Sequence, residues 1–275
     1  MNAKRRHPLR AACLLALGAL VLVPLALTLF TSFADPAWVK EHYQGQARAL
    51  WTVDLRLTFA QYEALLQGAA ILPTLLTTFA YAALTTLLHL GVSLVVAFAL
   101  TKVKARGNGL LSFLYLVGMA LPVQALLLPC YVVLHRLGLG DNWASLYLTA
   151  IFAPFGVFFL RQAMATLPDS LLEAALLETS GAGALLFRIV LPTVQPSVIA
   201  LGALAFSDAW NAVEQPMILL SGWQVRPIAL RLVNMVRDAK LETVFAFAVL
   251  AVLPVGALYC MTRKHLFAAM ENFRF

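Results

Sequence analysis

The stretch PDSLLEAALLETSGAGALLFRIVLP, residues 168–192, is a polar, helix-forming insert between two strongly apolar segments. Pro168 ends the preceding segment. Ser170, followed three residues later by Glu173, has the pattern of a capping box, which satisfies free backbone N–H groups at a helix start. The residues that then share one helical face are Leu172, Ala175, Leu176 and Thr179. Since glycines follow at 181 and 183, we expect a short helix, a glycine bend and a second short helix.

Two interpretations of this insert agree with its physics. A helix with one small apolar face and polar flanks can dock into a groove on a partner protein, or it can lie on the surface of a membrane. The pattern itself leaves both open.

The composition places the insert in a membrane protein. Hydrophobic residues make up 61% of the chain and charged residues 12%, against about 25% charged residues in typical soluble domains. A membrane-spanning helix needs roughly 20 mostly apolar residues. Six segments meet this requirement, namely Leu9–Phe33, Leu72–Thr101, Gly109–Leu134, Trp143–Met164, Ser197–Leu220 and Thr243–Thr262.

The first apolar segment has a competing interpretation as a cleaved secretory signal, because Ser32-Phe33-Ala34 resembles a small-residue cleavage site. Its apolar run from Ala11 to Phe30 is longer than the roughly 7–15 residues of a signal-peptide core. The length therefore favours an uncleaved membrane anchor.

Flanking charges predict the orientation. With the N-terminus inside, 12 of the 20 basic residues but only 4 of the 13 acidic ones fall on inner segments. Cytoplasmic loops are enriched in Lys and Arg, so we expect both termini in the cytoplasm. The formal net charge of +7 then reports topology, and its spread over separate short loops excludes a nucleic-acid partner.

Motifs for chemistry are absent from the sequence. It contains no GxxxxGK[ST], HExxH or GxSxG pattern, so we expect no catalytic residue, no ATPase motif and no bound cofactor. Cys13, Cys130 and Cys260 show no CxxC spacing, and we expect no metal site. His89, inside the second span, is interpreted as bonded between helices in preference to a transport role.

Outside the membrane, Leu57–Leu66 is predicted to form a short amphipathic helix that begins at Thr58. Its apolar face carries Phe59, Tyr62 and Leu66. The helix could rest on the membrane or dock an external partner, and the former is favoured.

The fifth span carries polar side chains that are costly within a membrane. Asp208, Asn211 and Gln215 are spaced to share one helical face, beside Trp210 and Glu214. Intramembrane carboxylates usually face a water-filled pathway or a polar partner. We favour pathway lining over bonding between helices.

Several motifs together resemble the binding-protein-dependent permeases of ABC importers. In the insert these are Glu173-Ala174-Ala175, the run Ile189–Pro192 ending in Leu191 and Pro192, and the preceding Phe159–Gln162. This pattern is similar to the EAA loop, and its spacing matches the carbohydrate branch. Further similarities are Leu121-Pro122, Leu128-Pro129, Leu134–Leu139 and Trp210-Asn211.

The resemblance implies an all-α fold of the type I ABC importer permease, with six transmembrane helices and a cytoplasmic coupling helix. It implies a sugar-import function in the cell membrane of a prokaryote. The expected partners are a second permease subunit in a heterodimer, two cytoplasmic ATPase subunits that use the ATP, and an external solute-binding protein that delivers the carbohydrate.

The resemblance also divides the chain and assigns the coupling contact. The division is 1–69 for the N-terminal part, 70–262 for the permease core with its coupling loop at 165–192, and 263–275 for the tail. Residues expected to contact the ATPase are Glu173, Ala174, Ala175, Leu176, Thr179, Gly181, Leu191 and Pro192. Thr179 stands where the family usually has glycine, so the bend is expected to move to Gly181.

Two alternative functions remain. The first is a permease for another solute, such as a peptide, a polyamine or glycerol phosphate, because the EAA loop is shared more widely. The second is a membrane scaffold without transport activity, which would bind no ATPase.

Overall fold

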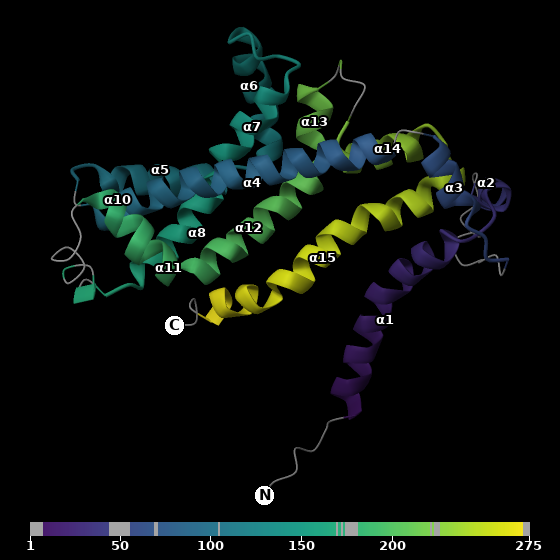
Figure 1. Ribbon diagram of the computed structural model, residues 1–275, viewed down its shortest axis with the longest axis horizontal. Coiled ribbons are helices and arrows are strands. Elements are labelled where there is room, and N and C mark those ends of the chain that lie inside the picture. Colours follow the sequence, from purple (N-terminus) through teal and green to yellow (C-terminus); the bar gives the residue numbers. More distant parts are fainter. Residues whose placement is uncertain are drawn as a thin grey trace, which may run out of the picture. The chain divides into compact units, whose positions relative to one another are not determined.

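The computed structural model describes residues 8–43, 56–68, 71–103, 105–168, 170–171, 173, 181–220, 222 and 226–271. The chain divides into two compact units: residues 1–73 with 231–253, and residues 74–230 with 254–275. Every regular element within the described ranges is helical (Figure 1). The all-α prediction is confirmed.

The first unit contains α1 (Pro8–Thr31), α2 (Pro36–Tyr43), α3 (Ala60–Gln67) and the 3₁₀ turn η3 (Leu241–Thr243), which contacts both α2 and α3. A buried glutamine joins these parts. The Gln61 amide nitrogen donates to the carbonyls of Thr31 (2.7 Å) and Ala34 (3.0 Å), and its oxygen accepts from the Ala246 backbone N–H (3.4 Å).

Helix α3 corrects the prediction for residues 57–66. The helix begins at Ala60 instead of Thr58, and its fully buried side chain is Gln61. Phe59 and Leu66, from the predicted apolar face, are 67% and 69% exposed, and the contact of that face with a membrane or partner stays a prediction. Gln61 can be buried because three backbone groups form hydrogen bonds with its amide, which removes the usual cost of burying a polar group.

The second unit contains most of the remaining helices. They are α5 (Asn108–Ala120), α6 (Val123–Arg136), α7 (Trp143–Ile151), α8 (Pro154–Ala165), α10 (Ala182–Ala184), the π-helical turn η2 (Leu185–Val190), α11 (Leu191–Thr193), α12 (Gln195–Trp210) and α13 (Glu214–Leu219). Three helices contribute to both units: α4 (Ile71–Lys102), α14 (Ile228–Arg237) and α15 (Val244–Glu271). Helix α8 contacts α5 and α12, while α13 contacts α6 and α7.

Helix breaks coincide with prolines. The axes of α5 and α6 differ by 107° across Leu121-Pro122, and the α10–α11 segment differs from α12 by 81° across Val194. Helix α8 begins with Pro154 directly after the break that ends α7. Proline lacks a backbone N–H and restricts the residue before it, so it tends to start helices and to end the preceding one.

Four described helical segments are long and apolar enough to cross a membrane, and the number rises to six when each bent pair counts as one span. The segments are Ala12–Thr31, Ile71–Lys102, Trp143–Ala165 and Leu241–Ala269, with the bent pairs Asn108–Ala120 plus Val123–Arg136 and Ala182–Thr193 plus Gln195–Trp210. These segments overlap the six expected from the sequence.

The fifth span differs from its prediction at the far end. Helix α12 ends at Trp210, and a separate short helix, α13, begins at Glu214, whereas we expected one helix from Ser197 to Leu220. Polar residues lie at this break, namely Asn211, Glu214 and Gln215, and we had placed them within one continuous helix. The sequence analysis also missed α14, which directly follows Pro227.

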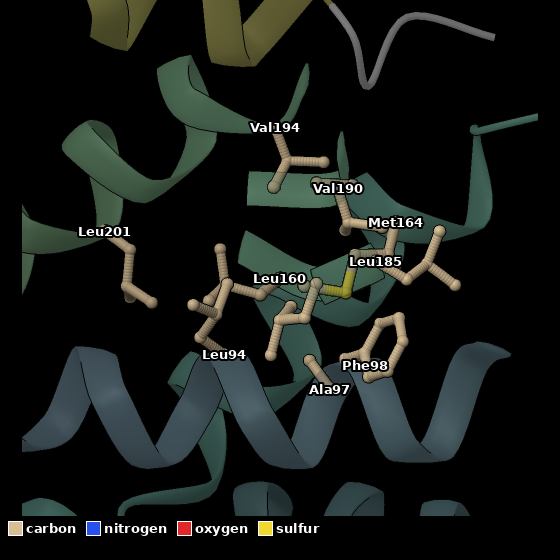
Figure 2. Packing of buried hydrophobic residues seen from close by; sticks show 11 residues of the cluster. Leu94, Ala97, Phe98, Leu160, Met164, Leu185, Val190, Val194 and Leu201 are labelled. Carbon is tan, nitrogen blue, oxygen red and sulfur yellow. The ribbon is translucent and has the colours of Figure 1, made fainter. Parts of the chain in front are cut away.

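A hydrophobic core in the second unit joins four helical segments. It consists of Leu94, Ala97 and Phe98 from α4, Leu160, Ala163 and Met164 from α8, Leu185, Leu186 and Val190 from η2, and Val194 and Leu201 at and beyond the start of α12. Figure 2 shows Leu160 and Met164 lying between α4 and the side chains of Val190 and Val194. The two ends of the polar insert are therefore held in one core.

Candidate functional site

The coupling loop is described at its two ends. Ser170, Leu171 and Glu173 are helical and exposed, which agrees with a helix that starts after Pro168. Four of the expected contact residues, Ala174, Ala175, Leu176 and Thr179, lie outside the described residues. The capping box and the docking face therefore stay predictions.

Beyond this gap, Gly181 provides the bend expected there. Its φ of 102° and ψ of 152° lie in a region that essentially only glycine occupies. Leu191 packs against the hydrophobic core, while Pro192 is exposed in the short helix α11. The loop thus returns to the protein through a glycine and is anchored by the leucine that precedes the proline.

A lysine missed by the sequence analysis fixes the start of the loop. The Lys102 ammonium group, at the end of α4, donates to the Leu167 carbonyl at 3.0 Å. Leu167 directly precedes Pro168, so the bond joins the end of α4 to the entry of the loop. We had interpreted Lys102 only as a topology signal, since a partner 65 residues away leaves no local pattern.

Helix α12 connects the loop to a cavity. It starts just after Val194, which lies in the core, and its 16 residues give a rod about 24 Å long at 1.5 Å per residue. Leu201, within α12, belongs to the core and also lines the cavity. One helix therefore joins the loop, the core and the cavity.

The cavity has a volume of about 490 Å³, within the range of small-molecule sites. Helices α4, α7, α8 and α12, the Asn211–Val213 break and α13 contribute most of its lining. The polar or ionisable side chains in this lining are Tyr81, Thr85, His89, Thr149, Asp208, Asn211, Glu214 and Gln215.

Four of the five pathway candidates line this cavity: Asp208, Asn211, Glu214 and Gln215. They do not share one continuous helix, because α12 ends at Trp210 and the last two belong to α13. The interruption between α12 and α13 brings these four side chains to the same cavity. The Asn211 amide nitrogen donates to the Ser207 carbonyl at 2.8 Å, which leaves its side-chain oxygen as an acceptor.

Trp210, the fifth candidate, is placed elsewhere. It is 1% exposed, is not among the cavity-lining residues, and stacks on Phe206 with ring centroids 5.7 Å apart. Tyr81 and Phe155 are the aromatic residues that line the cavity. Tyr81 in turn packs edge-on against Trp143, with ring centroids 5.8 Å apart.

His89 combines the two roles that we had treated as alternatives. Its Nδ1 atom is bonded to the Ile151 carbonyl at 3.1 Å, which joins α4 to the end of α7, and its side chain also lines the cavity. Gly156 leaves room for it, because a Cβ atom there would overlap Nε2 of His89 and Oγ of Ser93. The bond between helices confirms the interpretation made from sequence.

Residues 89–271 match the family described as "Binding-protein-dependent transport system inner membrane component". The chain belongs to this family. The match includes the described parts of the coupling loop and most of the cavity lining. The resemblance to ABC-importer permeases inferred from the EAA loop is confirmed, and the chain is a multi-pass membrane transport permease.

Curated relatives carry the same assignment. The chain is 27% identical over 180 residues to the arabinooligosaccharides transport system permease protein of Halalkalibacterium halodurans, covering 65% of this chain and 64% of that protein. It is 25% identical over 276 residues to the diacetylchitobiose uptake system permease protein of Streptomyces coelicolor, covering 95% and 86%. The chain thus spans somewhat less than two thirds of the first relative.

A solved structure has the same fold. The crystal structure of a bacterial ABC transporter involved in the import of the acidic polysaccharide alginate matches with a TM-score of 0.77 and 20% identity, covering 96% of this chain and 98% of that one. The predicted fold class, an ABC-importer permease, is confirmed.

Proposed function

We propose that this protein is the membrane-spanning subunit of an ATP-driven importer and forms part of the translocation pathway for a sugar. Two relatives are named as permeases for arabinooligosaccharides and diacetylchitobiose, which supports an oligosaccharide as the solute. The cavity supports a sugar as the solute too, because polar side chains that hydrogen-bond to hydroxyls and aromatic rings such as that of Tyr81 are suited to binding a sugar.

The observation that carries the proposal is the continuity between the coupling loop and the cavity. Both ends of the loop enter one core, and α12 leads from that core to Asp208 at the cavity. A push on the loop would move a packed helical unit, because protein interiors are close-packed and transmit displacement. ATP hydrolysis by a separate subunit could thereby open and close the pathway.

The expected partners follow from a function in which this chain forms the pathway and a separate subunit hydrolyses ATP. Two cytoplasmic ATPase subunits would bind at residues 168–192 and use the ATP, a second permease subunit would complete the pathway, and an external binding protein would deliver the solute. This chain would bind no cofactor and catalyse no reaction. The excess of Lys and Arg on the loop side supports a cytoplasmic location for the loop and both termini.

The pathway would include Asp208, Asn211, Glu214 and Gln215, which the cavity already groups together. Trp210 would support the pathway by packing on Phe206. The coupling contact would be made by the exposed Glu173 together with Ala174 and Ala175, where small side chains permit close approach of the partner.

The test is coupling in the complete transporter reconstituted in vesicles with its binding protein. Glu173→Ala and Ala174→Leu should each reduce uptake per ATP hydrolysed at least tenfold. Glu63→Ala is the matched control, because Glu63 is an exposed carboxylate on α3 and is not part of the loop. Unchanged coupling in both loop variants would refute the coupling role. A complex that purifies without any ATPase subunit would favour the scaffold function.

A further inference from the structure

The carboxylate side chains of the cavity lining are not matched by Lys or Arg side chains. Of its described lining residues, Asp208 and Glu214 are acidic and none is lysine or arginine. His89 and Tyr81 are the remaining ionisable side chains of the lining. The charged residue types of the lining are therefore weighted toward carboxylates.

The lining also offers hydrogen-bond acceptors to a solute. The Ile151 carbonyl can only accept, so Nδ1 of His89 must carry the hydrogen in their 3.1 Å bond. In the neutral imidazole this leaves Nε2 as an acceptor, on a side chain that is 5% exposed and lines the cavity.

Several other lining groups accept hydrogen bonds. Carboxylate and amide oxygens are acceptors, and the lining holds those of Asp208, Asn211, Glu214 and Gln215. A solute that donates hydrogen bonds can satisfy these oxygens. Sugar hydroxyls do so, whereas ionised carboxylates and phosphates only accept.

We propose that this cavity selects uncharged, hydroxyl-rich saccharides and excludes anionic ones such as uronates and sugar phosphates. The inference rests on the proposed function, because it assumes that the solute passes this cavity, and it narrows the solute from sugars in general to neutral sugars. Two unit charges about 8 Å apart at an effective dielectric constant of about 20 change an equilibrium or a rate by about thirtyfold, so two carboxylates suffice for strong selection.

The experiment measures the cavity charge without knowing the sugar. Single cysteines are placed at two lining positions, Ala212→Cys and Thr149→Cys, in the complete transporter after Cys13, Cys130 and Cys260 are changed to serine. Each is labelled with a cationic and with an anionic methanethiosulfonate reagent, and the ratio of the two rates is normalised to that of a free thiol. Ala37→Cys, on α2 outside the cavity, is the control position.

We expect the cationic reagent to be favoured at least tenfold at both cavity positions. Adding Asp208→Asn or Glu214→Gln should lower that preference severalfold there, with no change at Ala37→Cys. A normalised ratio near one, or a preference that survives both charge removals, would overturn the inference. Uptake of arabinooligosaccharides and of diacetylchitobiose, the solutes named for two relatives, is measured in parallel with the unlabelled transporter. Absence of uptake of both would count against the proposed function, whereas uptake of either combined with a ratio near one would refute only the charge selection.

Discussion

Gly156 lies where any side chain would collide with two buried polar groups. A Cβ atom built there overlaps Nε2 of His89 and Oγ of Ser93, whose residues are 5% and 0% exposed. The imidazole cannot withdraw freely, because its Nδ1 atom is bonded to the Ile151 carbonyl. We therefore expect Gly156→Ala to disturb the packing of α8 on α4 and the wall of the cavity together.

The size of the effect follows from three contributions. Overpacking a filled site costs about 1–3 kcal/mol, and loss of the His89–Ile151 bond adds about 0.6 kcal/mol, the mean for such bonds between membrane helices. Alanine returns at most about 1 kcal/mol of helix propensity relative to glycine. The net expectation is a destabilisation of about 1–3 kcal/mol, with slower uptake because His89 lines the cavity.

The assay compares glycines that differ in their surroundings. Gly91 on α4 has no atom within 4 Å of a built Cβ, whereas the nearest atom at Gly202 on α12 is Leu90 Cδ1 at 3.3 Å. Unfolding of the purified protein in mixed micelles should rank Gly91→Ala as most stable, then Gly202→Ala, then Gly156→Ala. Adding His89→Ala should remove part of the Gly156→Ala cost. Equal stability of the Gly156 and Gly91 variants would refute the reasoning.

Three further substitutions test other parts of the fold. Gly181→Ala should cost about 1–3 kcal/mol of backbone strain at a φ of 102° and should reduce uptake per ATP hydrolysed. Gly183→Ala is the control, because Gly183 has open space around it, and this variant should change neither stability nor uptake. Gln61→Leu leaves three backbone groups without their partner and should lower stability by about 1–3 kcal/mol; the exposed Gln67→Leu on the same helix should leave unfolding in micelles unchanged. Lys102→Met keeps the apolar stem but loses the bond to the loop entry, so ATPase activity should proceed with less uptake, and normal coupling would contradict its anchoring role.

The membrane spans and the position of the loop could be predicted from the sequence because they depend on local properties. A run of apolar residues is sufficient to indicate a spanning helix, and proline and glycine mark where the loop begins and bends. Gly181 illustrates this, since a bend at this residue follows from glycine's tolerance of positive φ.

The features that were missed depend on partners distant in sequence. Gln61 is buried because carbonyls 30 and 27 residues away accept from it, and no periodicity shows such partners. Trp210, a pathway candidate because its aromatic face suits a sugar, lies at the end of α12 and stacks on Phe206, four residues earlier. Its role in the pathway stays a prediction.

The break after Trp210 gives the polar residues of the fifth span an arrangement that a continuous helix would lack. A straight helix through Gln215 would carry the polar residues of the fifth span along one face, about 10 Å from Asp208 to Gln215 at 1.5 Å per residue. Because the helix is interrupted at Asn211–Val213, Asp208 and Glu214 instead line one cavity from two separate helices. Helix α12 is tied to the coupling loop through the core, whereas α13 packs against α6 and α7. A movement of α12 relative to α13 would change the separation of the two carboxylates, and would thereby couple the loop to the charge that a passing solute meets.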